Sequence, residues 1–351
     1  MLFVKLNKYL ARIVPDQIPG AVCWIGTTKR TLFFEAFGYA QVEPRKVRIS
    51  KETVFDLASI TKPFATATAI MKCVAQGALR LHDPVARYLG EFKNTVNNRV
   101  TIAKLLTHSS GLPAWFPLYI IPEDTRMPYM AQTTLRTPQV VYSCLGYIIL
   151  GILIKRVTGQ DVSSFCQNHI FKPLHLDSMR FSPDTIRNIA ATEKGDQYER
   201  SMTAEFCDPT IHKWRNRVIR GEVHDGNCFY AYKGISGNAG LFGNAPDCGR
   251  FLQSLLNHTI LPKKYVTMMI QDHTGGHEKR GLGWWVDPFP EFFSHGTFAH
   301  TGFTGTMVCV DPMKDIIIVL LTNAIHPHVR QEVKRRIRRK VVEIVAGTLL
   351  R

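Results

Sequence analysis

The stretch Phe55-Asp-Leu-Ala-Ser-Ile-Thr-Lys-Pro63 is the strongest indication of fold and chemistry in the chain. A strand-like apolar run ends at Ala58, and a long helical pattern follows at once and stops near Gly77, a residue typical of helix C-caps. Ser59 and Lys62 lie at this junction, and residues three apart on a helix share one face. A serine hydroxyl is a weak nucleophile until a base takes its proton. The spacing therefore predicts an acyl-transfer enzyme centred on Ser59 and Lys62.

Composition indicates an ordinary globular protein with an uneven charge distribution. The chain has 351 residues, of which 45% are hydrophobic and 21% charged, and its formal net charge is +16. Seven basic residues lie between Arg330 and Lys340, on a segment in which valine or isoleucine recurs every four residues from Val329 to Val345. This pattern predicts a terminal amphipathic helix with a solvated cationic face; contact of that face with an anionic surface is the alternative. No zinc-finger spacing, aromatic-basic RNA motif or basic zipper occurs, so no nucleic-acid partner is expected.

Cysteine usage and apolar runs bear on the cellular compartment. Eight cysteines occur without CxxC pairs, which favours reduced thiols in a cytosolic protein over a disulfide scaffold. The first fourteen residues interleave basic and apolar side chains, as in an amphipathic helix, and lack the features of a signal peptide. The longest candidate membrane run, Tyr147 to Ile154, is far shorter than the ~20 residues that span a bilayer. We therefore expect a cytoplasmic protein with no transmembrane segment.

Strand and helix patterns predict how the chain is organised. Residues 21–26 and 31–38 read as a hairpin, and residues 306–311 and 315–322 read as two strands joined by a short turn, hence antiparallel. Further strands are expected at 284–286 and 298–300, and a glycine-rich bend at 234–240 leads into a helix near 247–256. Between the N-terminal hairpin and the C-terminal strands, residues from about 80 to 230 form a largely helical region, with helices beginning at Asp83, Val100 and Tyr142.

The predicted fold class is α/β (α+β), with an antiparallel sheet flanked by helices and a mostly helical insertion. Residues 1–80 and 230–351 would form the sheet-containing domain from both ends of the chain, and residues 81–229 the insertion. The two parts would make one catalytic unit with a cleft between them.

Two further motifs contain groups that can take part in acyl transfer. The first is Val141-Tyr-Ser-Cys-Leu-Gly-Tyr147, at the start of a helix, where a tyrosine beside a cationic lysine can relay a proton. The second is Ala299-His-Thr-Gly-Phe-Thr-Gly305 at a strand edge. Small residues there let backbone N–H groups approach a bound carbonyl without steric cost.

These three motifs, in this order and spacing, resemble the serine β-lactamase and penicillin-binding-protein superfamily. The resemblance is greatest to its branch of class C β-lactamases, D-peptidases and esterases, which is marked by SxxK, then YxN or a relative, then KTG or HTG. The resemblance covers roughly residues 18–328, and four further stretches match it: Val100–Pro113, Arg220–Gly226, Gly237–Phe242 and Asp311–Asn323.

The resemblance implies a β-lactamase/transpeptidase-like fold and a catalytic site. Ser59 would attack a carbonyl and form an acyl-enzyme, with Lys62 and Tyr142 as the base system. For that role the pKa of Lys62 would fall from about 10.4 towards neutrality. The backbone N–H groups of Ser59 and Phe303 would form the oxyanion hole. The remaining expected substrate-binding residues are His300, Thr301 and Gly302. His300 would stand where other members have lysine and would present a polar or cationic edge to the substrate and to Tyr142.

Cys144 departs from the superfamily pattern, because β-lactamases and peptidases usually have asparagine at this position. An asparagine amide can bond both the lysine and a substrate amide, whereas a thiol is a poor donor and acceptor. An ester needs fewer polar contacts, so esterase activity is favoured. The alternatives are a D-amino-acid peptidase or amidase, a weak β-lactamase, and a non-catalytic binding protein on the same fold.

Other candidate residues receive structural interpretations. We expect His108, His224 and Asp225 to organise loops, and Cys144 to act as a small apolar residue and substrate contact, not as a second nucleophile. His273 and His277 lie in a glycine-rich stretch without a nearby acidic ligand, so no metal is expected. No cofactor is expected, and the partner would be a small-molecule or peptide substrate.

Overall fold

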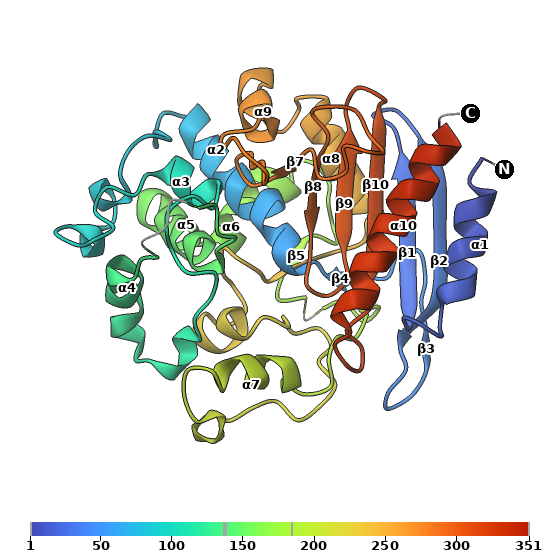
Figure 1. The fold of residues 1–351 in the computed structure, drawn as a ribbon, viewed down its shortest axis with the longest axis horizontal. Helices are drawn as coiled ribbons and strands as arrows, with labels where there is room; N and C mark the ends of the chain where they lie inside the picture. The colour runs from blue at the N-terminus through green and yellow to red at the C-terminus, as the bar shows by residue number, and fades with distance from the viewer. Residues whose placement is uncertain (1, 136–138, 184, 350–351) are drawn as a thin grey trace.

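A seven-stranded antiparallel sheet forms the centre of the computed structural model, which describes residues 2–135, 139–183 and 185–349 (Figure 1). In order across the sheet, the strands are β3 (Val47–Arg48), β2 (Thr31–Gln41), β1 (Gly20–Gly26), β10 (Ile316–Thr322), β9 (Met307–Asp311), β8 (Phe298–Thr301) and β7 (Trp285–Val286). The predicted antiparallel sheet, with its hairpin of β1 and β2 and its pairing of β9 with β10, is confirmed.

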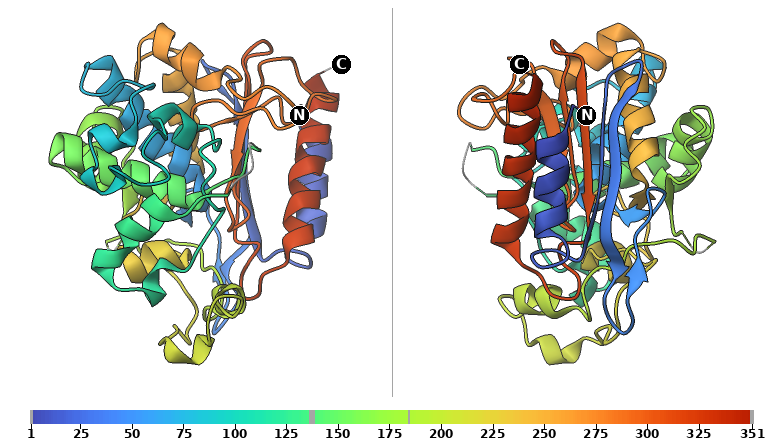
Figure 2. Two further views of the ribbon diagram at one scale, coloured as in Figure 1. Left: turned by 60° about the vertical axis from the view of Figure 1, so that its left-hand side comes forward. Right: turned by 90° about the vertical axis from the view of Figure 1, so that its right-hand side faces the viewer.

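The central strand β10 is buried along its whole length because helices cover both faces of the sheet. Ile317 and Val319 belong to the core that includes α2 (Thr68–Ala75) and α8 (Ala245–Leu256). Ile318 and Leu320 point the other way and pack with α1 (Val4–Ile13) and α10 (Gln331–Leu349). Figure 2 shows α1 and α10 side by side over one face of the sheet, with the other helices beyond the opposite face. This alternation is the period-2 pattern of a strand buried on both faces.

Most remaining helices lie between residues 102 and 270. They are α3 (Ile102–Leu106), α4 (Glu123–Gln132), α5 (Cys144–Thr158), α6 (Val162–Cys166), α7 (Gln197–Thr203) and α9 (Lys263–Ile270). A small second sheet orders β4 (Phe55–Asp56), β6 (Leu241–Gly243) and β5 (Arg180–Phe181). The helix predicted to begin at Asp83 is only a 3-10 turn, Val85–Arg87. The division into two domains stays a prediction, and its outer limits, residues 1 and 351, lie outside the described residues.

The C-terminal helix confirms the predicted amphipathic pattern but not a fully solvated cationic face. Ile337, Val341 and Val345 are buried against the sheet. Two of the basic residues, Lys334 and Arg338, turn inward, while Arg335 and others remain exposed. Contact of the exposed side with an anionic surface stays a prediction. Among the described residues, no helix is both long enough and apolar enough to cross a membrane.

Candidate active site

Ser59 lies at a sharp junction between β4 and the helix that ends in α2. Ala58 has a φ of 48°, an unusual value for a residue other than glycine, and its N–H is bonded to the carboxylate of Asp56 at 2.8 Å. Ser59 follows in a 3-10 turn (Ala58–Ile60), and Lys62 begins a π-helix (Lys62–Ala67). Instead of one regular α-helix, a tight 3-10 turn carries Ser59 and a wider π-helix carries Lys62. The two side chains still lie together, as predicted for one helix face.

Lys62 is fully buried and directs its amine at Ser59. Its Nζ lies 3.0 Å from Ser59 Oγ, 2.9 Å from the carbonyl oxygen of Asn238 and 3.6 Å from Cys144 Sγ. Three acceptors match the three donors of an ammonium group. Burial alone lowers the pKa of Lys62, but the neighbouring Cys144 and Tyr142 raise it, and the net direction is upwards. The expected depressed pKa of Lys62 is therefore not found.

Tyr142 lies beside Lys62, whose Nζ is 5.0 Å from the centroid of the phenol ring. Burial raises the pKa of Tyr142, and the positive charge of Lys62 opposes that rise. His108 holds this segment: its ring lies against that of Tyr142 in a tilted arrangement, with centroids 4.4 Å apart, and its Nδ1 accepts a hydrogen bond from the N–H of Ser143 at 2.9 Å. Burial lowers the pKa of His108 well below its usual value. His108 therefore organises the tyrosine loop, as predicted.

Two neighbours of this centre, Asn238 and Arg280, were not among the site residues expected from the sequence, although Asn238 lies in the matching stretch Gly237–Phe242. Asn238 holds Lys62 through its backbone carbonyl, while its side-chain amide donates to Asp225 at 3.1 Å. The guanidinium carbon of Arg280 lies 5.4 Å from the ring centroid of Tyr142. Arg280 is buried and bonded to Glu278, although its sequence surroundings are those of an exposed loop. Only the tertiary contacts mark Arg280 as part of the site.

The HTG motif forms the end of β8 and the turn after it. His300 is buried, and burial together with the Lys62 and Arg280 charges lowers its pKa well below the usual value. Its ring is therefore neutral and presents a polar edge without a charge, 6.0 Å from Tyr142 between ring centroids. Gly302 must be glycine, because a Cβ atom there would lie 2.4 Å from the carbonyl oxygen of Leu57.

A cavity of about 240 Å³ opens beside Ser59. It is lined by Ala58, Ser59, Ala114, Trp115, Tyr142, Cys144, Tyr198, Glu199, Met202, His224, Asp225, Ala239 and Phe303. Four of the predicted site residues thus share one cavity. His300, Thr301 and Gly302 are not among its lining residues, so their predicted contact with substrate stays a prediction.

Most of the cavity wall is apolar, but two carboxyl groups reach it. Glu199 is buried and accepts a hydrogen bond from Tyr119 at 3.0 Å. Burial, with the nearby charge of Asp225, raises the pKa of Glu199 to about 8. Asp225 is half-buried and is held by Asn238 and by the N–H of Cys228. The wall therefore combines apolar surface with a largely neutral Glu199 at pH 7.

The backbone N–H groups of Ser59 and Phe303 are the predicted oxyanion hole. Both residues line the cavity. Within the described parts of the chain, neither N–H has a hydrogen-bond partner. Free donors at the nucleophile are what a developing oxyanion requires. No group of metal-ligating side chains is found among the described residues, and all eight cysteines are free thiols.

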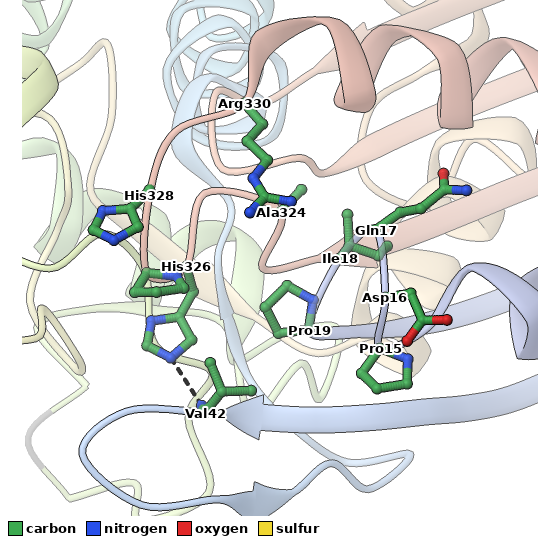
Figure 3. A pocket seen from close by; sticks show the side chains of 11 residues that line it. Pro15, Asp16, Gln17, Ile18, Pro19, Val42, Ala324, His326, His328 and Arg330 are labelled. Carbon is green, nitrogen blue, oxygen red and sulfur yellow. Dashed lines mark hydrogen bonds between the residues drawn. The ribbon is translucent and has the colours of Figure 1, made fainter.

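A second cavity, of about 140 Å³, lies just beyond the C-terminal end of β10 and shares no lining residue with the first (Figure 3). His326 points towards the Val42 backbone and accepts its N–H at 2.9 Å, and its other nitrogen is 2.7 Å from the carbonyl oxygen of Thr192. Both ring nitrogens are thus satisfied, and His326 joins three chain segments. This cavity contains no activated nucleophile.

Comparison with known proteins agrees with the geometry. The chain matches the Beta-lactamase family over residues 6–343. It is 30% identical over 366 residues to N-acetylmuramyl-L-alanine amidase of Bacillus subtilis (strain 168), covering 92% of this chain and 81% of the relative. It is 29% identical over 369 residues to an Escherichia coli (strain K12) protein with the provisional name D-alanyl-D-alanine carboxypeptidase, covering 92% of this chain and 82% of the relative.

Solved structures show the same fold. EstCE1, described as a hydrolase with promiscuous acyltransferase activity, superimposes with a TM-score of 0.76 at 22% identity, covering 97% of this chain and 98% of EstCE1. The octameric penicillin-binding protein homologue from Pyrococcus abyssi has a TM-score of 0.72 at 23% identity, covering 96% of this chain and 77% of that chain. The chain belongs to the Beta-lactamase family, a family of serine hydrolases with the β-lactamase/transpeptidase-like fold.

Proposed function

We propose that the protein is a serine hydrolase that cleaves an ester or amide carbonyl through an acyl-Ser59 intermediate. The observation that carries this proposal is the 3.0 Å contact of Lys62 Nζ with Ser59 Oγ at the wall of an open cavity. Family membership adds support, because the motifs that contain both residues lie within the matched range.

The proposed reaction begins with loss of one proton from the coupled Lys62–Tyr142 pair. The base so formed takes the proton of Ser59 as Oγ bonds to the substrate carbonyl carbon. The N–H groups of Ser59 and Phe303 hold the oxyanion, and its collapse expels the leaving group, which receives the proton. Water then repeats these steps on the acyl-enzyme, releasing the acid and restoring Ser59. Removing one such N–H donor costs other enzymes roughly 10²–10³ in rate.

An ester is the favoured substrate. Cys144 lines the cavity and occupies one acceptor position around Lys62, so a thiol stands where an amide would bind a substrate N–H or carbonyl. The cavity wall beside it is mostly apolar, with Trp115 and Met202 on it, and suits an uncharged acyl or alkyl group.

Amide or peptide cleavage is the second candidate. It is supported by the two relatives at 29–30% identity, whose names describe an amidase and a carboxypeptidase acting on D-alanyl-D-alanine. Asp225 supports it too, since this half-buried carboxylate could accept N–H groups of a peptide. Weak β-lactam hydrolysis belongs to the same candidate, because it also needs amide recognition.

A fluorophosphonate probe tests the proposal directly. The intact protein should gain one adduct, located on Ser59 by mass spectrometry, and Ser59→Ala should gain none while keeping its circular dichroism spectrum. Rates on a p-nitrophenyl ester, a chromogenic cephalosporin and a D-alanyl-D-alanine peptide then rank the substrates. A folded protein with Ser59 unmodified would instead favour a non-catalytic binding protein.

A further inference from the structure

The C-terminal helix α10 places two cations against the turn that follows β8. Lys334 Nζ donates a hydrogen bond to the carbonyl oxygen of Phe303 at 2.7 Å, and the guanidinium of Arg338 donates to the carbonyl oxygen of Gly302. Lys334 and Arg338 are four residues apart, so they lie on one face of the helix. The basic segment therefore contacts the turn that carries one of the two proposed oxyanion-hole donors.

Removing these two cations from water is costly, with Lys334 buried and Arg338 half-buried. Desolvation lowers the pKa of Lys334 to about 7 and that of Arg338 to about 10. Neither group forms an ion pair with a carboxylate within the described residues. A fold that buries two cations on backbone carbonyls gives up their hydration, and such groups are often retained for a specific arrangement and not for stability.

The geometry of the peptide unit connects Arg338 to the cavity. The carbonyl of Gly302 and the N–H of Phe303 belong to one planar trans peptide group, so they point in opposite directions. Arg338 holds the carbonyl on the side of α10, and the N–H of Phe303 is then directed away from the helix. Phe303 itself lines the cavity of Ser59. A cation bonded to the carbonyl also polarises the peptide, which makes its N–H a stronger donor.

The ring of Phe303 is held as firmly as its backbone. Lys334 Nζ lies 3.8 Å from the ring centroid, His224 stacks on the ring at 5.3 Å, and Tyr198 contacts it at 4.8 Å. His224 is in turn bonded to Glu193 at 2.9 Å. These contacts fix the side chain of Phe303, while rotation of the Gly302–Phe303 peptide group would break the hydrogen bond from Arg338.

We propose that Arg338 and Lys334 are positioning residues for the oxyanion hole, acting through the peptide groups of Gly302 and Phe303. The proposal rests on the proposed function of Ser59, since the hole has a role only during acyl transfer. It assigns a catalytic use to a basic helix that sequence patterns describe as a solvated surface element.

Kinetics of three matched variants test the proposal. Arg338→Met and Lys334→Met remove each cation but keep most of its apolar stem, and Arg335→Met makes the same change at an exposed neighbour on α10. Against a p-nitrophenyl ester, we expect kcat to fall by about tenfold or more for Arg338→Met, with KM changed less than threefold, because a weakened oxyanion donor acts on the transition state. Lys334→Met should show a smaller fall, and Arg335→Met should stay within twofold of the wild type.

A boronic acid inhibitor separates positioning from simple stabilisation. The boronate formed on Ser59 places an oxygen in the oxyanion hole, so its inhibition constant should rise in Arg338→Met by a factor similar to the loss in kcat/KM. A lower Tm with unchanged kcat and boronate affinity would overturn the proposal. If Arg338→Met does not fold, Arg338→Gln replaces it and should show the same parallel losses. A wild type that forms no Ser59 adduct would overturn the proposed function itself.

Discussion

The ammonium group of Lys62 lies 3.6 Å from the sulfur of Cys144, so a thiol occupies one of three acceptor positions around the lysine. The other two positions are taken by Ser59 Oγ and the carbonyl oxygen of Asn238. An amide in place of the thiol would offer a stronger acceptor to Lys62 and an N–H group to the substrate.

Cys144→Asn should therefore shift the substrate preference from esters towards amides. We expect the ratio of amide to ester kcat/KM to rise by about tenfold, because one hydrogen bond to an amide substrate contributes ~1 kcal/mol or more. Cys207→Asn, at a half-buried position after α7, makes the same change away from the cavity and should leave the ratio unaltered. An unchanged ratio in Cys144→Asn would show that the thiol does not limit amide turnover.

The activity should increase with pH through the alkaline range. The pKa values of Lys62 and Tyr142 both lie above their ordinary values, so at pH 7 the pair holds the proton that must leave before Ser59 can be activated. Because the reactive form is the deprotonated one, kcat/KM should rise with pH, by up to about tenfold per pH unit, until the pair has titrated.

Tyr142→Phe tests which group of the pair supplies the base. We expect a loss of about 10²–10⁴ in kcat at pH 8, the usual size for proton-transfer catalysis. Tyr265→Phe, in α9 and outside the cavity, is the matched control.

For the pH dependence, a wild-type plot of kcat/KM against pH that is flat or falls between pH 7 and 10 would contradict this account of the base.

Arg280 should influence Tyr142 through its charge. Its guanidinium lies 5.4 Å from the ring centroid of Tyr142, where it favours the phenolate. Arg280→Met should therefore raise the pKa of Tyr142 and displace the pH–rate profile to higher pH, with a loss of about tenfold at pH 7, since one pKa unit corresponds to tenfold in the deprotonated fraction.

Lys279→Met removes a charge from the same loop, at a side chain paired with Asp287 and more exposed than Arg280. The Lys279→Met variant should keep the pH–rate profile of the wild type at the same pH. If both variants lose activity without any displacement along the pH axis, Arg280 has a packing role only.

Glu199 should make the folded state less stable as pH rises. Its pKa is raised from 4.5 to about 8 in the folded protein, so between these values the folded state holds a proton that the unfolded state has released. The free energy of unfolding therefore falls as pH increases through this window, and the full effect is at most ~5 kcal/mol, taking about 1.4 kcal/mol for each pKa unit.

Denaturant titrations at pH 5 and pH 8 measure this effect. Glu199→Gln should flatten the pH dependence by a few kcal/mol at most, whereas Glu205→Gln, at an exposed position nearby, should not change it. Equal slopes for the wild type and Glu199→Gln would mean that Glu199 is ionised in the folded state.

The local sequence predicted most of the strands and helices and the candidate site residues. The strands that form the sheet, the helix after Ser59 and the amphipathic helix α10 follow from hydrophobic periodicity, which acts over a few residues. Ser59, Lys62, Tyr142 and Cys144 were identifiable because each stands in a short motif at a strand or helix end. The 3-10 turn and π-helix around Lys62 do not follow from hydrophobic periodicity; the π-helix is bonded to the glycine-rich loop through Lys62 and Thr66, a contact between segments far apart in the chain.

The sequence by itself determined which serine and lysine are proposed as nucleophile and base, because Ser59 and Lys62 are three residues apart in one motif. Only the tertiary structure decided the surroundings of the Lys62 amine, the place of Arg280 beside Tyr142 and the contact of Arg338 with Gly302. Each of these depends on burial or on distance between segments far apart in the chain. A basic residue has the same appearance in a sequence whether it faces water or a backbone carbonyl, and folding alone brings the two partners together.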